Sequence, residues 1–226
     1  MMGYTRRNPL KGRGRSRNEI LFPKKAGVEY DKLQMTEEGE YSITKRRDGE
    51  KLIQIMKDTV KNLKAKTITD MTGNVGGDTI LFGLHFKKVW SYEINPENFS
   101  ALKNNVEVFK LKNVELHQGD SVKEVLLKEH NWNGVDVPDD ADVVYIDAPW
   151  GGPDYKEKKD LDLFLGKHRI DVIVDDLLSS WEYGPRFVFL KLPANYNFSR
   201  LDSLGLKWEK HKIRGFYVVC LFANKK

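Results

Sequence analysis

The sequence is poor in cysteine and has no long hydrophobic stretch. Cys220 is the only cysteine, so no internal disulfide can form, which fits a reducing compartment. The longest apolar run, residues 216–223, is eight residues long, whereas a membrane-spanning helix needs about twenty. No basic and then apolar leader opens the chain, which argues against secretion. Histidines and cysteine do not cluster, so we expect an intracellular protein with neither a membrane segment nor a metal site.

Acidic residues are almost absent from the first 25 positions. This segment holds eight lysines and arginines against one acid, Glu19, whereas the whole 226-residue chain has a net charge of only +5. Its glycines, serine and proline disfavour helices and strands, so we expect a flexible basic tail over residues 1–25. Such a tail suits the phosphates of RNA or DNA. A solvated tail that only aids solubility is the alternative.

The remaining sequence alternates between helical and strand patterns. After a turn at 37–41, helices are expected at 49–63, 78–86, 96–110, 121–130 and 170–180. Strands are expected at 67–71, 88–94, 114–117, 142–147 and 186–192, and the runs 206–213 and 216–222 predict a hairpin. This pattern predicts an α/β fold with a mostly parallel, Rossmann-like sheet and a C-terminal antiparallel hairpin, as in class I methyltransferases. We expect a helical extension over residues 26–65 and the sheet domain over residues 66–226.

The first three predicted strands end at residues suited to a nucleotide-like ligand. Residues 70–79 read D-M-T-G-N-V-G-G-D-T before a helix, where glycines let a ligand approach the backbone. Glu93 can accept hydrogen bonds from two ribose hydroxyls, as in NAD and S-adenosylmethionine sites, and Asp120 from an adenine amino group. The strand ends share one edge of the sheet, so they describe a cofactor with a ribose and an adenine. The candidate cofactor-binding residues are Asp70, Thr72, Gly73, Gly76, Gly77, Thr79, Glu93, Ile94, Asp120 and Asp147.

The fourth predicted strand ends in D-A-P-W, residues 147–150. An acidic or amide side chain followed by proline and an aromatic residue suits the methylation of an exocyclic amine on a base. The amine lone pair is delocalised into the ring, and acceptors on its N–H bonds favour a pyramidal nitrogen. Asp147 and a backbone carbonyl near Pro149 would be those acceptors, while Trp150 would stack on the base and align it. We therefore expect Asp147, Pro149 and Trp150 to be the catalytic residues.

Together these segments resemble the RNA cap guanine-N2 methyltransferases, the trimethylguanosine synthases. The string P-W-G-G-P-D-Y at 149–155 is the most specific part of this resemblance, which extends to residues 70–79 and 92–96. Upstream, E-G-E-Y-S-I-T at 38–44 resembles the family's segment before its first helix, and downstream L-P-A-N at 192–195 resembles its L-P-R-N turn. The similarity covers about residues 30–222, which is essentially the whole body of the chain.

The resemblance implies transfer of a methyl group from S-adenosylmethionine to the 2-amino group of a 7-methylguanosine cap, giving di- or trimethylguanosine. It implies that Trp150 stacks on the cationic cap base and that Tyr155 lies near the cap phosphates. It also implies capped RNA as the partner. We further expect the basic tail to contact RNA, no membrane association, and a monomer in the nucleus, the cytoplasm or a viral factory. The candidate substrate-binding residues are Thr44, Lys45, Trp150, Tyr155, Lys191 and Asn195.

Three departures from the family pattern leave alternatives open. D-A-P-W replaces the usual S-P-P-W and is also similar to the D-P-P-W of adenine amino-methyltransferases. Ala194 replaces the phosphate-contacting arginine of L-P-R-N, for which Lys191 or the tail would have to compensate. S-I-T-K-R-R at 42–47 replaces S-V-T-P-E-K. The alternatives are an amino-methyltransferase of adenine or guanine in other RNA or DNA, and an inactive homologue that only binds caps or RNA.

Overall fold

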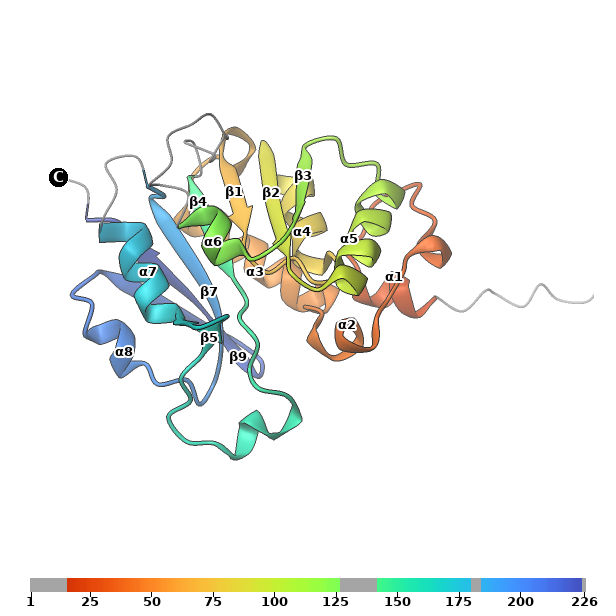
Figure 1. Cartoon of the computed structure of the whole chain (residues 1–226). Coiled ribbons are helices and arrows are strands. Elements are labelled where there is room, and N and C mark those ends of the chain that lie inside the picture. The colour runs from red at the N-terminus through yellow and green to blue at the C-terminus, as the bar shows by residue number, and fades with distance from the viewer. Residues whose placement is uncertain (1–15, 127–141, 180–183, 225–226) are drawn as a thin grey trace, which may run out of the picture.

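A seven-stranded sheet in the order β3-β2-β1-β4-β7-β9-β8 crosses the protein (Figure 1). The computed structural model describes residues 16–126, 142–179 and 184–224. The strands are β1 (Thr67–Asp70), β2 (Lys88–Glu93), β3 (Val114–Gln118), β4 (Val143–Ile146), β7 (Phe187–Pro193), β8 (Trp208–Ile213) and β9 (Phe216–Phe222). All pairs from β3 to β7 are parallel, whereas β9 pairs antiparallel with both β7 and β8. The predicted α/β fold with a C-terminal hairpin is confirmed.

Helices cover both faces of this sheet (Figure 1). Helices α6 and α7 pack on one face, and α3 and α4 pack on the other, with α5 beside α4. The helices are α1 (Arg17–Leu21), α2 (Glu37–Ser42), α3 (Arg46–Thr59), α4 (Gly77–His85), α5 (Pro96–Val108), α6 (Ser121–Val125), α7 (Ile170–Ser179) and α8 (Ser199–Asp202). Among the described residues, the short elements are 3-10 helices at Tyr30–Lys32, Leu63–Ala65 and Pro153–Glu157 and a small hairpin of β5 (Phe164–Leu165) and β6 (His168–Arg169).

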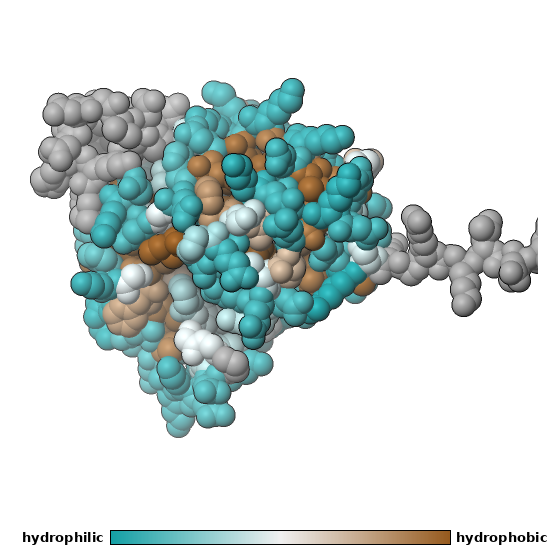
Figure 2. Space-filling model, turned by 45° about the vertical axis from the view of Figure 1, so that its right-hand side comes forward, coloured by the Kyte–Doolittle hydropathy of each residue, from teal (hydrophilic) through white to brown (hydrophobic). Residues whose placement is uncertain are grey.

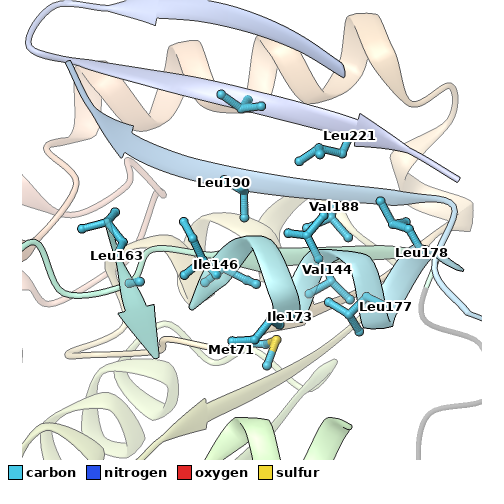
Figure 3. Close-up of a cluster of buried hydrophobic side chains, with 14 of the residues drawn as sticks. Met71, Val144, Ile146, Leu163, Ile173, Leu177, Leu178, Val188, Leu190 and Leu221 are labelled. Atoms are coloured by element: carbon cyan, nitrogen blue, oxygen red, sulfur yellow. The ribbon is translucent and has the colours of Figure 1, made fainter. Parts of the chain in front are cut away.

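The alternation of side chains along the buried strands decides what each face holds. In β4 and β7, Val144, Ile146, Val188 and Leu190 belong to the core beneath α7, which Figure 3 shows in close-up. Their neighbours in the sequence belong to the core beneath α3 and α4, where the ring of Tyr145 is fully buried. Because successive side chains of a strand point to opposite faces, Asp147 and Lys191 continue on the α3 and α4 side at the strand ends.

The N-terminal region departs from the sequence prediction in two places. Residues 37–41, expected to be a turn, lie in α2, whose first turn is capped by Thr36 accepting from the backbone of Gly39 at 2.9 Å. Part of the expected flexible tail is also folded: α1 precedes Phe22, which is fully buried and packs near the ring of Phe109. Residues 1–15 lie outside the described residues, so the tail prediction is not tested there.

The surface in Figure 2 is mostly hydrophilic with scattered hydrophobic patches. Five large apolar side chains are exposed in the described residues: Ile20, Tyr41, Ile94, Phe164 and Val172. None of the helices in the described part of the chain combines the length and apolar character that crossing a membrane requires. The helix expected at 121–130 begins as predicted, and its second half lies outside the described residues.

Candidate active site

The loop after β1 is built around a buried carboxylate. Asp70 is fully buried, and its two oxygens accept from the hydroxyl of Thr79 at 2.6 Å and the backbone N–H of Thr72 at 3.1 Å. Burial raises the pKa of Asp70 to about 7, although both hydrogen bonds favour the ionised form. Asp70 therefore joins the start of the loop to the first turn of α4 and fixes the shape of the loop.

Two glycines in this loop are required by space and backbone geometry. A Cβ on Gly73 would lie 2.6 Å from Ser91 Oγ and 2.9 Å from Leu102 Cδ2, so only glycine fits against β2. Gly76 has a φ of +95°, in the left-handed region that glycine adopts most readily. The sequence predicts that these glycines let a ligand approach the backbone. In the structure they let the loop pack closely against β2 and α5, which fixes the position of the loop.

The ends of β2 and β3 place two more carboxylates beside the loop. The Glu93 oxygens accept from the backbone N–H groups of Asn74 and Asn95, each at 2.7 Å. Burial raises the pKa of Glu93, while these backbone donors oppose the shift. Asp120 caps α6 by accepting from the backbone of Val122 at 3.1 Å. Both acids are thus held by the backbone, and each retains lone pairs that can accept further hydrogen bonds.

Ile94 follows Glu93 and is 66% exposed, which is unusual for a large apolar side chain at a strand end. It presents a hydrophobic surface next to the two carboxylates. An apolar surface flanked by fixed acceptors suits a flat base carrying a ribose. The candidate cofactor residues on β1, β2 and β3 therefore lie together along one half of the C-terminal sheet edge.

The end of β4 is tied to the first loop and to β7. The backbone N–H of Asp147 donates to the Thr72 hydroxyl at 2.9 Å, which links the β1 and β4 loops. Its carboxylate Oδ2 accepts from the Lys191 ammonium at 2.6 Å. Burial raises the pKa of Asp147 to about 6, against the attraction of Lys191. Oδ1 of Asp147 has no hydrogen-bond partner within the described parts of the chain.

Lys191 occupies a different place from the one we expected. The sequence suggested a contact with cap phosphates, but the residue is only 6% exposed and its ammonium lies inside the protein. The ammonium also donates to the Thr44 hydroxyl at 3.0 Å, and Thr44 donates to Asp78 Oδ2 at 2.7 Å. The hydroxyl of Tyr145 donates to the same Asp78 oxygen at 3.0 Å. Alternation along β7 explains this placement, because an odd-numbered residue there faces α3 and α4.

Trp150 lies between two aromatic rings. Its ring centroid is 5.1 Å from that of Tyr155 in an edge-to-face arrangement and 6.4 Å from that of Phe216. The Lys191 ammonium lies 5.6 Å from the Trp150 centroid and 5.3 Å from that of Phe216. Trp150 Nε1 is buried and has no partner in the described part of the protein. Phe216, which sequence reasoning missed, reaches this site because β9 begins opposite Pro193 at the end of β7.

The other predicted substrate residues surround this cluster less directly. Asn195 donates both side-chain hydrogens to the carbonyls of Tyr155 and Lys158, each at 2.7 Å, and so fastens the loop after Trp150. Lys45 is exposed at the start of α3, next to the buried Thr44. Pro149 is exposed between Asp147 and Trp150. Across the described residues, no group of three or more histidine, cysteine, aspartate or glutamate side chains is placed to hold a metal ion.

Solved structures of other proteins share this fold at low sequence identity. The human methyltransferase 10 domain containing protein superposes with a TM-score of 0.57 at 11% identity, covering 93% of this chain and 91% of that one. Precorrin-6y C5,15-methyltransferase from Geobacter metallireducens gives a TM-score of 0.55 at 15% identity, covering 86% of this chain and 95% of that one. Both similarities concern the fold alone, which is that of class I methyltransferases.

Sequence comparison narrows the family. An uncharacterized protein of Acanthamoeba polyphaga mimivirus is 27% identical over 199 residues, covering 79% of this chain and 74% of the viral protein. Trimethylguanosine synthase of Schizosaccharomyces pombe is 26% identical over 195 residues, covering 82% of this chain and 76% of the yeast enzyme. The sequence pattern of the RNA cap guanine-N2 methyltransferases matches residues 65–224. This chain therefore belongs to the RNA cap guanine-N2 methyltransferase family and is an S-adenosylmethionine-dependent methyltransferase of class I.

Proposed function

We propose that this protein methylates the exocyclic 2-amino group of a 7-methylguanosine RNA cap. The observation that carries this proposal is the end of β4, where the carboxylate of Asp147 and the ring of Trp150 stand at one edge of the sheet. Trp150 lies beside Tyr155 and Phe216, and Oδ1 of Asp147 is free to accept. A stacking ring beside a hydrogen-bond acceptor matches a flat base that carries an N–H bond.

S-adenosylmethionine would supply an electrophilic methyl group on a sulfonium, and breaking the carbon–sulfur bond as the methyl group joins the amine nitrogen would leave S-adenosylhomocysteine as the product. The residues at the other half of the edge fit such a cofactor. Glu93 and Asp120 keep acceptor capacity for ribose hydroxyls and an adenine amino group, and the exposed Ile94 offers an apolar surface for the adenine. The loop of residues 70–79, held by Asp70, would close around the cofactor between them.

Asp147 would act on the target amine. An exocyclic amine is a poor nucleophile because its lone pair is delocalised into the ring. Acceptance of one N–H by Asp147 Oδ1 favours pyramidal nitrogen and directs the lone pair at the methyl group. Such positioning of a near-attack geometry can lower the barrier by several kcal/mol, and by about 7–11 kcal/mol in well-oriented reactions. The methylated amine then carries an extra proton, which it loses readily to water without a dedicated base.

Trp150 would recognise the base itself. The 7-methylguanine ring carries a positive charge, and a tryptophan face attracts cations as well as flat rings. Tyr155 stands edge-to-face with Trp150, and the resemblance implies that it lies near the cap phosphates. The exposed Lys45 before α3 would contact the same phosphates, while Asn195 fastens the loop after Trp150 and Thr44 accepts a hydrogen bond from Lys191. Methylation once or twice would give di- or trimethylguanosine.

The test is methyl transfer from labelled S-adenosylmethionine to the 7-methylguanosine cap dinucleotide, with the unmethylated cap dinucleotide run in parallel. We expect transfer to the methylated cap alone, and a loss of about 100-fold in Trp150→Ala, because base–aromatic stacking contributes roughly 1–3 kcal/mol and also aligns the amine. Trp208→Ala, which removes the same side chain from β8 outside the site, is the matched control and keeps full transfer.

The remaining outcomes separate the alternative functions. Equal transfer to both caps, or to uncapped RNA, contradicts the cap assignment and supports an amino-methyltransferase of other bases. Cofactor binding by calorimetry without transfer to any nucleic acid supports a homologue that only binds. Competition by an excess of free methylated cap dinucleotide against a capped RNA provides a second measurement, because only a cap enzyme is strongly inhibited.

A further inference from the structure

Lys191 carries a buried ammonium that contacts Asp147 at the end of β4. Its side chain is 7% exposed, and that of its partner Asp147 is 19% exposed. Uncompensated burial of a charge is costly, so buried lysines are normally paired. Here the ammonium has one carboxylate at 2.6 Å and one hydroxyl at 3.0 Å as hydrogen-bond partners. The ammonium is therefore held from two sides, by Asp147 directly after β4 and by Thr44 two residues before α3.

The groups that face Lys191 keep it charged. Burial acts to lower its pKa, but Asp147 and Asp78 outweigh burial and raise the pKa of the lysine. Asp48 adds a weaker attraction and is itself paired with Arg214 at 3.2 Å. Two further titratable groups face this cluster: Asp70, whose pKa burial raises to about 7, and Tyr145, whose pKa burial raises well above its usual range, so that its hydroxyl stays neutral. Lys191 is thus an ammonium throughout the neutral pH range.

The Lys191 ammonium donates a hydrogen bond to only one of the two carboxylate oxygens of Asp147. Oδ2 accepts from Lys191, whereas Oδ1 has no partner in the described residues. The backbone of Asp147 is held independently by the Thr72 hydroxyl at 2.9 Å. With the backbone and one oxygen both fixed, the carboxylate cannot rotate without breaking the contact to Lys191. The direction of Oδ1 is therefore determined by Lys191, a residue 44 positions away in the sequence.

We propose that Lys191 is a positioning residue for methyl transfer: its ammonium holds Asp147 through Oδ2, so that Oδ1 alone meets the target amine, and Thr44 anchors the ammonium to the start of α3. The proposal rests on the proposed function for the identity of the amine, but the hold on Asp147 does not depend on which base is methylated.

A purely structural ion pair would behave differently. Replacing both members of a buried pair by groups without charge is often neutral or stabilising, whereas removing one member is strongly destabilising. The double variant Lys191→Met/Asp147→Asn lacks the carboxylate under either role, so it measures only whether folding stability depends on the ion pair. The kcat of folded Lys191→Met separates the two roles, because a purely structural role leaves kcat per folded molecule unchanged, whereas a positioning role lowers it.

The experiment uses the full chain with four variants: Lys191→Met, Lys191→Arg, the double variant, and Lys103→Met as a matched control on the exposed surface of α5. Methyl transfer to the cap dinucleotide is measured between pH 5 and 9. In parallel, the Asp147 carboxyl is titrated by NMR of protein carrying ¹³C-labelled aspartate. The NMR measurement needs no substrate, so it remains informative if the cap is not methylated.

For Lys191→Met we expect kcat to fall by about 100-fold while KM for the cap changes by less than about threefold. The acid limb of the rate profile and the NMR titration of Asp147 both move to higher pH, because the attraction that favours its ionised form is gone. Lys191→Arg recovers kcat to within about tenfold of the wild type, since it restores the charge with different geometry. The double variant regains thermal stability but not transfer, and Lys103→Met matches the wild type.

Two kinds of result would contradict the role of Lys191. An Asp147 titration that does not move in Lys191→Met, with kcat near the wild-type value, shows that Lys191 does not hold the carboxylate. If the wild type fails on every cap while the Asp147 titration does move, the cap assignment fails and the hold of Lys191 on Asp147 stands. If Lys191→Met does not fold, Thr44→Val replaces it: it keeps the ammonium, removes one anchor and lowers kcat about fivefold, and wild-type kcat in that variant contradicts the anchoring role.

Discussion

The two halves of the sheet edge are built from contacts of different reach along the chain. At the ends of β1 and β3, carboxylates accept from backbone groups two residues away: Asp70 from Thr72 and Asp120 from Val122. At the ends of β4 and β7, the principal contacts join Asp147 to Lys191 across 44 positions and Lys191 to Thr44 across 147. We call the ends of β1, β2 and β3 the proposed cofactor half and the ends of β4 and β7 the proposed substrate half. Asp70 and Asp120 in the first are held by neighbouring residues, whereas the Asp147–Lys191 contact in the second forms only in the assembled fold.

The two halves are therefore expected to respond differently to substitutions elsewhere in the protein. A locally held carboxylate keeps its place as long as its own loop is folded. Asp147 keeps its place only while β7 and the residue before α3 are correctly packed against it. The buried Trp150 Nε1 and Asp78 Oδ1, both without partners in the described residues, also lie on the substrate side. Unsatisfied buried polar groups cost free energy and are retained most often at functional sites.

The largest effect on methyl transfer is expected from Asp147→Asn, which removes the charge of the carboxylate but keeps the size of the side chain. The Lys191 ammonium takes the amide oxygen, so the amide NH₂ faces the target amine and donor meets donor. Loss of one such hydrogen bond lowers kcat by about 100- to 1000-fold. We expect the affinity for S-adenosylmethionine to change by less than about threefold, because the cofactor half does not depend on this charge.

Labelled methyl transfer and calorimetry check these two expectations separately. Asp176→Ala, an exposed acid on α7, is the control for removing a carboxylate elsewhere. Asp147→Asn with unchanged kcat contradicts the role of the carboxylate, and a large loss of cofactor affinity shows that the two halves are not independent.

The strand, loop and helix around residues 70–79 could be predicted because their signals lie within one short segment. A strand followed by D-M-T-G-N-V-G-G-D-T and a helix has few alternatives, and Glu93 follows at the end of the next strand. The chain alternation also predicted the order of the elements and the C-terminal hairpin around Arg214 and Gly215. The local signals and the tertiary structure agree in these regions, which is why the predictions there hold.

In the proposed substrate half, the sequence predicted which residues take part but not which of them contact one another. Lys191 was assigned to phosphates because nothing in its local sequence shows that a residue before α3 and one after β4 enclose it. Phe216 gave no signal, since only the antiparallel register of β9 brings it beside Trp150. The helix α2 was missed, since a turn was expected over residues 37–41, a segment that contains Gly39. In the fold this glycine is buried, and a Cβ there would lie 2.6 Å from Val75 Cγ1.

The next largest effect is expected in the cofactor half, from Gly73→Ala. The added methyl meets Ser91 Oγ and Leu102 Cδ2 at less than 3.0 Å, so the loop must move away from β2. Overpacking of this kind costs about 1–3 kcal/mol of stability. We expect cofactor affinity to fall by about tenfold or more, with kcat at saturating cofactor reduced much less. Gly215→Ala, where a Cβ meets nothing within 4 Å, is the control, and equal cofactor affinity in both variants contradicts the packing argument.

A smaller effect on kcat is expected from a change of pH. The pKa of Asp147 is raised by burial to about 6, so its acceptor role is present above that pH and is lost as pH falls through it. We expect kcat, measured with both substrates saturating, to fall about tenfold per unit below pH 6 and to be level from pH 7 to 8. A rate that stays level down to pH 5 shows that no carboxylate with a raised pKa takes part in transfer.

The smallest effect concerns the basic N-terminal residues, which test whether RNA contacts extend beyond the sheet edge. Deleting residues 1–15 removes five bases and leaves α1 and the buried Phe22 in place. We expect this deletion to leave transfer to the cap dinucleotide unchanged and to weaken binding of a longer capped RNA. The slope of log affinity against log salt becomes shallower by roughly 1 to 3, since each lost phosphate contact contributes about 0.7 on single strands.

Two further measurements make this prediction specific to charge. Full-length chain in which those five bases are replaced by glutamine should show the same shallower slope, because length is kept and only charge is lost. Deleting residues 1–25 instead removes Phe22, whose burial against Phe109 makes its loss cost about 3–5 kcal/mol of stability. An unchanged slope in the glutamine variant would show that the basic residues serve solubility. RNA recognition would then be confined to the sheet edge, where the locally built and the long-range halves of the site meet.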